Sequence, residues 1–151
     1  MALSKKKNNE SKNMHFSRED QKKILSSSSP FIVKEAYSSI RTNLLFSQKG
    51  DECPVFIVTS PTANNGKSIN SVNMAVSFAQ MGKKTLLIDA DMRNPTVHRL
   101  FSIPVKNGLS EILAGLTDNI TVSKTDIENL SVLTAGKIPP NPSELLSSER
   151  T

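Results

Sequence analysis

Three consecutive residues, Gly66-Lys67-Ser68, match the end of the phosphate-loop pattern G-x-x-x-x-G-K-[ST]. In such a loop, backbone N–H groups and the positive end of the following helix surround phosphate oxygens. The lysine reaches the terminal phosphates, and the hydroxyl group ligates Mg²⁺. Pro61 stands where the pattern has its first glycine. The match is therefore incomplete, and a surface turn that happens to contain these three residues is the alternative.

The two residues before Gly66 decide whether the loop can still form. They are Asn64 and Asn65, and asparagine adopts positive φ more readily than other residues with a side chain. We therefore expect residues 64–69 to surround a nucleotide phosphate through Asn64, Asn65, Gly66, Lys67, Ser68 and Ile69. The strain of asparagine at positive φ predicts a weakened site rather than a lost one.

A second group of residues that could do chemistry is the pair Asp89 and Asp91, which lie at and just beyond the end of the apolar run LLID. Ligand sites in open parallel sheets lie at the carboxyl ends of strands. Two carboxylates there suit Mg²⁺ beside a triphosphate, because Mg²⁺ takes oxygen ligands and few protein groups. Lys67, Asp89 and Asp91 are thus the candidate catalytic residues, with Ser68, Asp89 and Asp91 as metal ligands. The alternative is a solvated acidic turn paired with Arg93.

Secondary-structure patterns around these residues predict an α/β fold with a parallel sheet and flanking helices, like that of P-loop NTPases. Short apolar runs predict neighbouring parallel strands at residues 54–59, 84–89 and 130–134. Helices are expected over residues 33–45, from Lys67 to Gly82, over 95–100 and 108–116, and after the N-cap Asn141. The first helix has an apolar face of Val33, Ala36, Tyr37, Ile40, Leu44 and Leu45.

Charge and composition separate the chain into two parts. Residues 1–29 carry seven of the 19 Lys and Arg and three of the 14 Asp and Glu, so they hold +4 of the net charge of +5. We interpret them as a disordered basic leader, followed by a folded domain over residues 30–151. The nearly neutral domain argues against a nucleic-acid partner. The single cysteine excludes an internal disulfide and favours the cytoplasm. No apolar run is long enough for a transmembrane segment.

Four segments, in order and correctly spaced, resemble the bacterial tyrosine kinases of capsule and exopolysaccharide synthesis, in their cytoplasmic single-domain form. EAYSSIRTN (35–43) is similar to the first helix of the family, and TSPTANNGKS (59–68) to its Walker A loop. LLIDADMRNPTVH (86–98) is similar to the Walker A′ motif, and GKIPPNPSELLSS (136–148) to the segment before the next helix. The resemblance covers roughly Pro30 to the end of the chain.

The resemblance implies an ATP-dependent, autophosphorylating protein-tyrosine kinase that uses Mg²⁺. Lys67 would bind the β- and γ-phosphates, Ser68 would ligate Mg²⁺, and both aspartates would act at the metal and the incoming tyrosine hydroxyl. Glu35 and Arg41 would belong to a motif, E-x-x-R-x-x-R, through which subunits of a homo-oligomer meet. A membrane adaptor protein would activate the kinase, which places the chain in the cytoplasm, peripheral to the inner face of the membrane.

Several positions depart from the family. Ser38 replaces the middle arginine of the subunit motif, and no Walker B strand follows. We therefore interpret the chain as the N-terminal part of a kinase domain, truncated and with weak or no activity. A partition or division-site ATPase and a non-catalytic, adaptor-binding remnant are the alternatives. Tyr37 is the only tyrosine, and its place on the apolar helix face predicts core packing.

Overall fold

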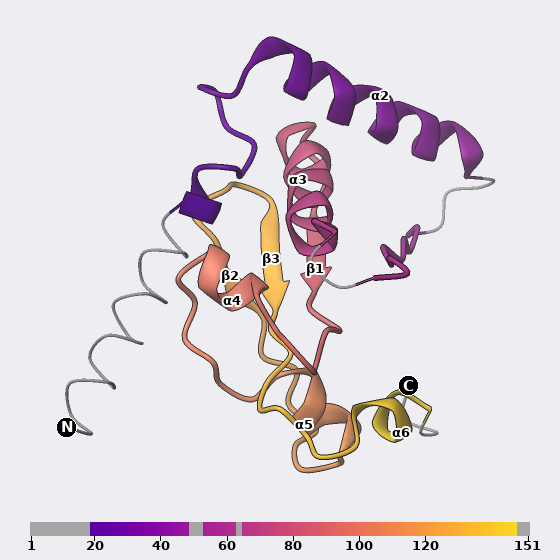
Figure 1. Cartoon of the computed structure of the whole chain (residues 1–151), viewed down its shortest axis with the longest axis vertical. Helices are drawn as coiled ribbons and strands as arrows, with labels where there is room; N and C mark the ends of the chain where they lie inside the picture. Colours follow the sequence, from indigo (N-terminus) through magenta and orange to yellow (C-terminus); the bar gives the residue numbers. More distant parts are fainter. Residues whose placement is uncertain (1–18, 49–52, 63–64, 148–151) are drawn as a thin grey trace.

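The computed structural model describes residues 19–48, 53–62 and 65–147. These residues form a mixed α/β fold in which helix α3 lies between a small sheet and helix α2 (Figure 1). The elements, in chain order, are α2 (Phe31–Ser47), α3 (Lys67–Gln80), β1 (Thr85–Ile88), α4 (Val97–Leu100), α5 (Leu109–Leu113), β2 (Ser123–Lys124), β3 (Leu130–Leu133) and α6 (Pro142–Leu146).

The sheet has the strand order β1-β3-β2. Strands β1 and β3 are parallel, with Thr85 opposite Leu130 and Ile88 opposite Leu133. The predicted strands at 84–89 and 130–134 are thus confirmed as parallel neighbours. The prediction of a parallel sheet was wrong for β2, which pairs with β3 in the antiparallel direction. This strand is only two residues long, too short for a periodic pattern to reveal it.

The predicted strand at residues 54–59 is wrong. This segment forms neither helix nor strand and pairs with no strand of the described chain. Val55 and Ile57 are 83% and 88% exposed, whereas Phe56 stacks on Phe78 of α3 at a ring-centroid distance of 5.6 Å. A continuous apolar run forms a buried strand only where other elements cover both of its faces. Here α3 covers one face, through Phe56.

The core lies between α3 and the sheet. Val72, Ala75, Val76 and Ala79 face it from α3, as their helical spacing predicts. They meet alternate strand residues, among which Leu87 and Val132 are buried, while Leu86 and Ile88 on the other face of β1 are each 48% exposed. Helix α3 therefore covers one face of the sheet at β1.

Helix α2 packs on α3 less completely than its pattern predicts. No residue of α2 is buried, and of the expected apolar face only Tyr37, Leu44 and Leu45 are half-buried. The other three residues of that face, Val33, Ala36 and Ile40, are exposed. The reason is geometric: α2 contacts one helix and no strand closely, so only a narrow stripe of its surface is covered.

Residues 19–29, which the sequence assigned to a disordered leader, are packed against the domain. Leu25 is 4% exposed and belongs to the main core. Its N–H donates to Oδ1 of the buried Asn73 at 2.8 Å, and Nδ2 of Asn73 donates to the carbonyl of Lys23 at 3.0 Å. One leucine among polar neighbours gives no periodic signal, which is why sequence patterns missed this anchor. Residues 1–18 lie outside the described residues.

The short helices α4, α5 and α6 fall within the expected ranges. Asn141 is the N-cap of α6 and Pro142 follows at its first position, as predicted. Among the described residues, every helix is too short or too polar to span a membrane.

Candidate nucleotide site

The loop that precedes α3 places Gly66 at the N-terminus of the helix. Gly66 has φ 73° and ψ 13°, the left-handed conformation that suits glycine. Its carbonyl accepts the first bond of the helix from the N–H of Asn70 at 2.9 Å. The exposed Asn65 donates from Nδ2 to Oγ1 of Thr62 at 2.6 Å. Asn64 lies outside the described residues.

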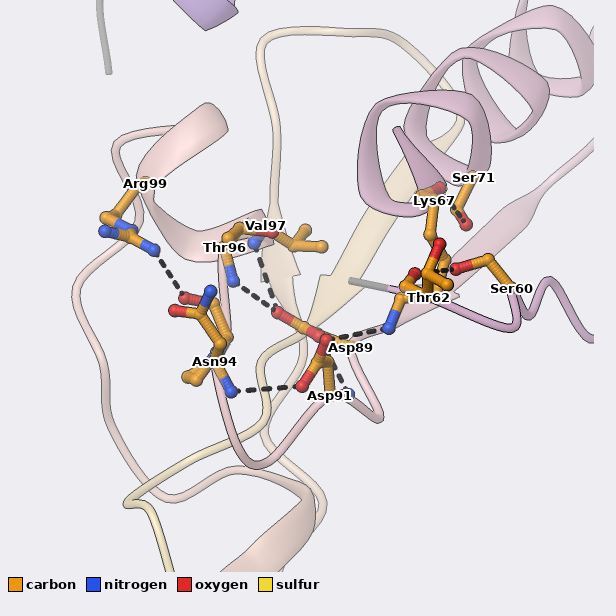
Figure 2. A network of polar contacts seen from close by, with 11 residues as sticks. Ser60, Thr62, Lys67, Ser71, Asp89, Asp91, Asn94, Thr96, Val97 and Arg99 are labelled. Carbon is orange, nitrogen blue, oxygen red and sulfur yellow. Dashed lines mark hydrogen bonds and ion pairs between the residues drawn. The ribbon is translucent and has the colours of Figure 1, made fainter. Parts of the chain in front are cut away.

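Lys67, Ser68 and Ile69 form the first turn of α3, and all three are half-buried. Their N–H groups lie at the positive end of a 14-residue helix, which favours an anion. The side chain of Lys67 extends away from this turn toward the end of β1, where it meets Asp91 (Figure 2). The structure thus brings the lysine of the loop and one of the two predicted aspartates together.

Asp89 directs its carboxylate away from Lys67, toward the backbone that begins α4 (Figure 2). Oδ2 accepts from the N–H groups of Thr96 at 3.2 Å and Val97 at 3.1 Å, and Oδ1 accepts from the N–H of Asp91 at 3.1 Å. The side chain is 5% exposed. Burial raises the pKa of Asp89, and the three backbone hydrogen bonds offset part of this rise.

Asp91 is the aspartate that faces the loop. Its Oδ2 lies 2.7 Å from Nζ of Lys67, and its Oδ1 accepts from the N–H of Asn94 at 3.0 Å. Partial burial by itself raises the pKa of Asp91. The hydrogen bond from Lys67, the N–H of Asn94 and the charge of Lys67 outweigh this, so the net pKa is lowered. The lowered pKa keeps Asp91 negatively charged beside Lys67.

The donor set fits a magnesium nucleotide unevenly. Ser68 and Asp91 offer a hydroxyl and a carboxylate near Lys67, and Mg²⁺ needs only one or two protein groups beside phosphate oxygens. The oxygens of Asp89 are already engaged by three N–H groups, so Asp89 suits the orientation of Asp91 better than direct ligation. Among the described residues, no group of three or more His, Cys, Asp and Glu forms a metal cage.

Arg93 is not the partner of the two aspartates, because its guanidinium donates to Oγ of Ser143 in α6 at 2.9 Å. The alternative of an acidic turn neutralised by Arg93 therefore has no support. The contact that sequence patterns missed is the bond from the start of α4 to Asp89. Thr96 and Val97 follow a proline, and proline is a common signal for a helix start. The first N–H groups of a helix have no acceptor within it, so a group such as a carboxylate must accept from them.

The two residues of the predicted subunit motif differ in their surroundings. Arg41 is engaged within the chain: Nη1 donates to the carbonyl and Oγ of Ser77 at 2.8 and 2.9 Å, and Nη2 donates to Oγ of Ser38 at 3.0 Å. Glu35 is exposed on α2. Ser38, which replaces an arginine of the motif, thus helps to hold Arg41 against α3.

Comparison with known proteins assigns the region of this site to a protein family. A family profile described as an AAA domain matches residues 62–147. The chain belongs to this family. Membership implies a nucleotide-binding role, and the matched region contains the first turn of α3 together with both aspartates.

The relatives of the chain confirm its resemblance to bacterial tyrosine kinases. It is 45% identical over 119 residues to the putative tyrosine-protein kinase CapB of Staphylococcus aureus, covering 78% of this chain and 52% of CapB. It is 41% identical over 131 residues to the tyrosine-protein kinase YwqD of Bacillus subtilis, covering 85% and 55%. The structure of the BceF tyrosine kinase domain superimposes with a TM-score of 0.73 at 42% identity, covering 84% and 51%. The chain spans about half the length of the relatives it matches.

Proposed function

We propose that this chain provides the nucleotide-binding part of an ATP-dependent protein-tyrosine kinase that regulates capsular or extracellular polysaccharide synthesis. The observation that carries the proposal is the 2.7 Å contact between Lys67, at the N-terminus of α3, and Asp91, beyond the carboxyl end of β1. A cation and a carboxylate that converge at a helix N-terminus suit a phosphate chain and its metal. The names of CapB and YwqD as tyrosine-protein kinases support the reaction class.

Each residue of the site has a role in this proposal. Lys67 contacts the β- and γ-phosphates, and the N–H groups of the first turn of α3 surround the phosphates. Ser68 and Asp91 hold Mg²⁺, which neutralises phosphate charge when it is bound. Asp89 fixes the backbone of Asp91 and the start of α4 through its three hydrogen bonds. Asn65, in the loop, and Ile69, in the first turn of α3, would lie beside the phosphates without contributing a charge.

Titration of a fluorescent ADP analogue with Mg²⁺ tests the site. Lys67→Ala should weaken binding by at least about tenfold, since it removes a charged hydrogen bond. Lys84→Ala is the matched control, because Lys84 is exposed before the opposite end of β1 and should bind like wild type. Equal affinities of wild type and Lys67→Ala would contradict the proposal.

A kinase assay tests the activity of the short chain. We expect the 151-residue chain to bind Mg·ADP or Mg·ATP weakly and to show no autophosphorylation alone, because the loop lacks its first glycine. Poor positioning of the phosphates and the metal harms turnover more than binding. Robust phosphate incorporation by this chain would show that the site is more complete than proposed.

Partners are part of the same proposal. An activating membrane adaptor would hold the chain at the inner face of the membrane, aided by the basic residues 1–29. Flotation with vesicles that carry the adaptor should recover the chain, whereas adaptor-free vesicles should not.

Homo-oligomers would form through α2, where Glu35 is exposed and available to a second copy. Sedimentation of Glu35→Ala and wild type would show whether this carboxylate contributes.

A further inference from the structure

The hydroxyl of Tyr37 joins α2 to the first turns of α3. The O–H donates to Oδ1 of Asn70 at 2.7 Å, and its oxygen accepts from Nδ2 of Asn73 at 3.3 Å. The ring packs against the main core, as its position in the sequence predicts. Asn70 in turn donates from Nδ2 to the carbonyl of Gly66 at 3.0 Å. A continuous chain of hydrogen bonds therefore runs from α2 to the phosphate loop.

The donors and acceptors in this chain are mutually consistent. The carbonyl of Gly66 can only accept, so the amide nitrogen of Asn70 must face it and Oδ1 must face Tyr37. The hydroxyl of Tyr37 then donates to Asn70 and keeps its lone pairs for Asn73. The other contacts of Asn73, from the N–H of Leu25 and to the carbonyl of Lys23, fix its orientation in the same sense. Each side-chain amide thus has one orientation.

The carbonyl of Gly66 and the N–H of Lys67 belong to one peptide unit. In a planar trans peptide these two groups point in opposite directions, so fixing the carbonyl also fixes the N–H. Asn70 holds the carbonyl twice, through its own N–H at 2.9 Å and through Nδ2 at 3.0 Å. The N–H of Lys67 is thereby directed outward from the N-terminus of α3. This restraint matters at Gly66 because glycine permits many other peptide orientations.

We infer that Tyr37 is a positioning residue of the nucleotide site, which acts through Asn70 to orient the Gly66–Lys67 peptide toward a bound phosphate. The inference rests on the proposed function, since it assigns a role within the same site. Tyr37 belongs to α2, which packs on α3, and in this inference it acts without touching the nucleotide. The hydroxyl preorganises the N–H of Lys67, and preorganised donors bind more tightly because less order is lost on binding.

The test measures affinity for the fluorescent ADP analogue in Tyr37→Phe, Asn70→Ala and the double variant. Phenylalanine keeps the ring in the core and removes only the hydroxyl. Loss of one hydrogen bond of ordinary strength corresponds to about threefold to tenfold weaker binding, which is the change expected for Tyr37→Phe. Asn70→Ala should weaken binding at least as much, and Tyr37→Phe should have no further effect in that background.

Two measurements separate positioning from a loss of stability. The Lys67 amide resonance of the nucleotide-free protein should shift in Tyr37→Phe, because the peptide is no longer held in one orientation. Ser47→Ala is the matched control: it removes a hydroxyl from α2 that, within the described part of the chain, bonds to the carbonyl of Leu44, and it should change neither affinity nor the Lys67 resonance. Urea unfolding of each variant should show that the protein stays folded during the titration.

The outcomes distinguish this inference from the proposed function. If Lys67→Ala loses affinity while Tyr37→Phe binds like wild type, the inference is overturned and the nucleotide site stands. If Tyr37→Phe weakens binding equally with and without Asn70, the hydroxyl acts by another route and the inference is also overturned. If Lys67→Ala binds like wild type, the proposed function fails, and an unchanged Lys67 resonance in Tyr37→Phe would overturn the peptide restraint separately.

Discussion

Nζ of Lys67 lies 2.7 Å from Oδ2 of Asp91, so the cation that would meet a phosphate is already paired. The two side chains are 34% and 25% exposed, which leaves the pair partly screened by water and modest in strength. A nucleotide must separate the pair or bring a metal that takes over the carboxylate. At the proposed site, Asp91 should therefore oppose nucleotide binding in the absence of metal and support it when Mg²⁺ is present.

Asp91→Asn should separate these effects. Without metal, the variant frees Lys67 and removes a negative charge beside the phosphates, so ADP should bind about threefold to tenfold more tightly than to wild type. With Mg²⁺ the gain should shrink or reverse, because a proposed metal ligand is lost. The measurement is titration of the ADP analogue in EDTA and in Mg²⁺. Asp126→Asn, at an exposed loop position, is the control, and tighter binding of Asp91→Asn only with Mg²⁺ would contradict the argument.

Glu111 should make the free energy of unfolding depend on pH in the acidic range. Its Oε2 accepts from the N–H of Gly108 at 2.8 Å and from Oγ of Ser110 at 3.0 Å, and its Oε1 accepts from the N–H of Lys137 at 3.1 Å. Burial alone would raise the pKa of Glu111, but these hydrogen bonds outweigh burial and lower the pKa below its ordinary value of 4.5.

A lowered carboxyl pKa stabilises the folded state above the unfolded pKa. The contribution of Glu111 should therefore be complete well above pH 4.5 and be lost as the pH falls through the lower folded pKa. Glu111→Gln should be less stable than wild type at pH 7, and the difference should shrink below pH 4.5. Urea unfolding at a series of pH values gives the result. A difference that stays constant down to pH 3 would show that the charge of Glu111 is immaterial.

Gly136 and Gly82 provide a matched pair of glycines with the same backbone angle. Each has φ +82°, but a Cβ on Gly136 would overlap Oε2 of Glu111, whereas nothing lies within 4 Å of a Cβ on Gly82. Both Gly→Ala variants incur the strain of the left-handed conformation, about 1–2 kcal/mol. Gly136→Ala should cost roughly 1–3 kcal/mol more, because the buried carboxylate must move. Equal free energies of unfolding of the two Gly→Ala variants would mean that the Glu111 side chain moves aside without cost.

The parts of the site that sequence patterns predicted are those with a local cause. Gly66 is demanded by a turn with positive φ, and the first turn of α3 follows directly from it. Asp91 comes two residues after the apolar run LLID, so its place beyond the carboxyl end of β1 follows from the strand. These relationships span few residues, and residue type together with spacing determines them.

The parts that were missed depend on contacts distant in sequence. Whether Val55 and Ile57 are buried depends on which strands lie beside them, and no local pattern contains that information. The different orientations of Asp89 and Asp91 depend on where α4 begins, because the N–H groups at its start donate to Asp89. The same holds for Tyr37, whose hydroxyl finds its partner 33 residues away in α3.

Leu25 provides the last test, because it decides whether residues 19–29 belong to the folded unit. It is 4% exposed and packs in the main core with residues of α3, although it lies in a polar, basic stretch. Truncation of a buried leucine to alanine costs about 2–5 kcal/mol, so Leu25→Ala should lower the free energy of unfolding by that amount. Leu116→Ala is the control, since Leu116 is 76% exposed and its truncation should change stability by less than about 0.5 kcal/mol. Trypsin should also cleave after Lys22 and Lys23 faster in Leu25→Ala, because the carbonyl of Lys23 is held by Asn73 only while the segment stays docked. Equal stability of the two leucine variants, with unchanged cleavage, would mean that residues 19–29 contribute nothing to the fold in solution.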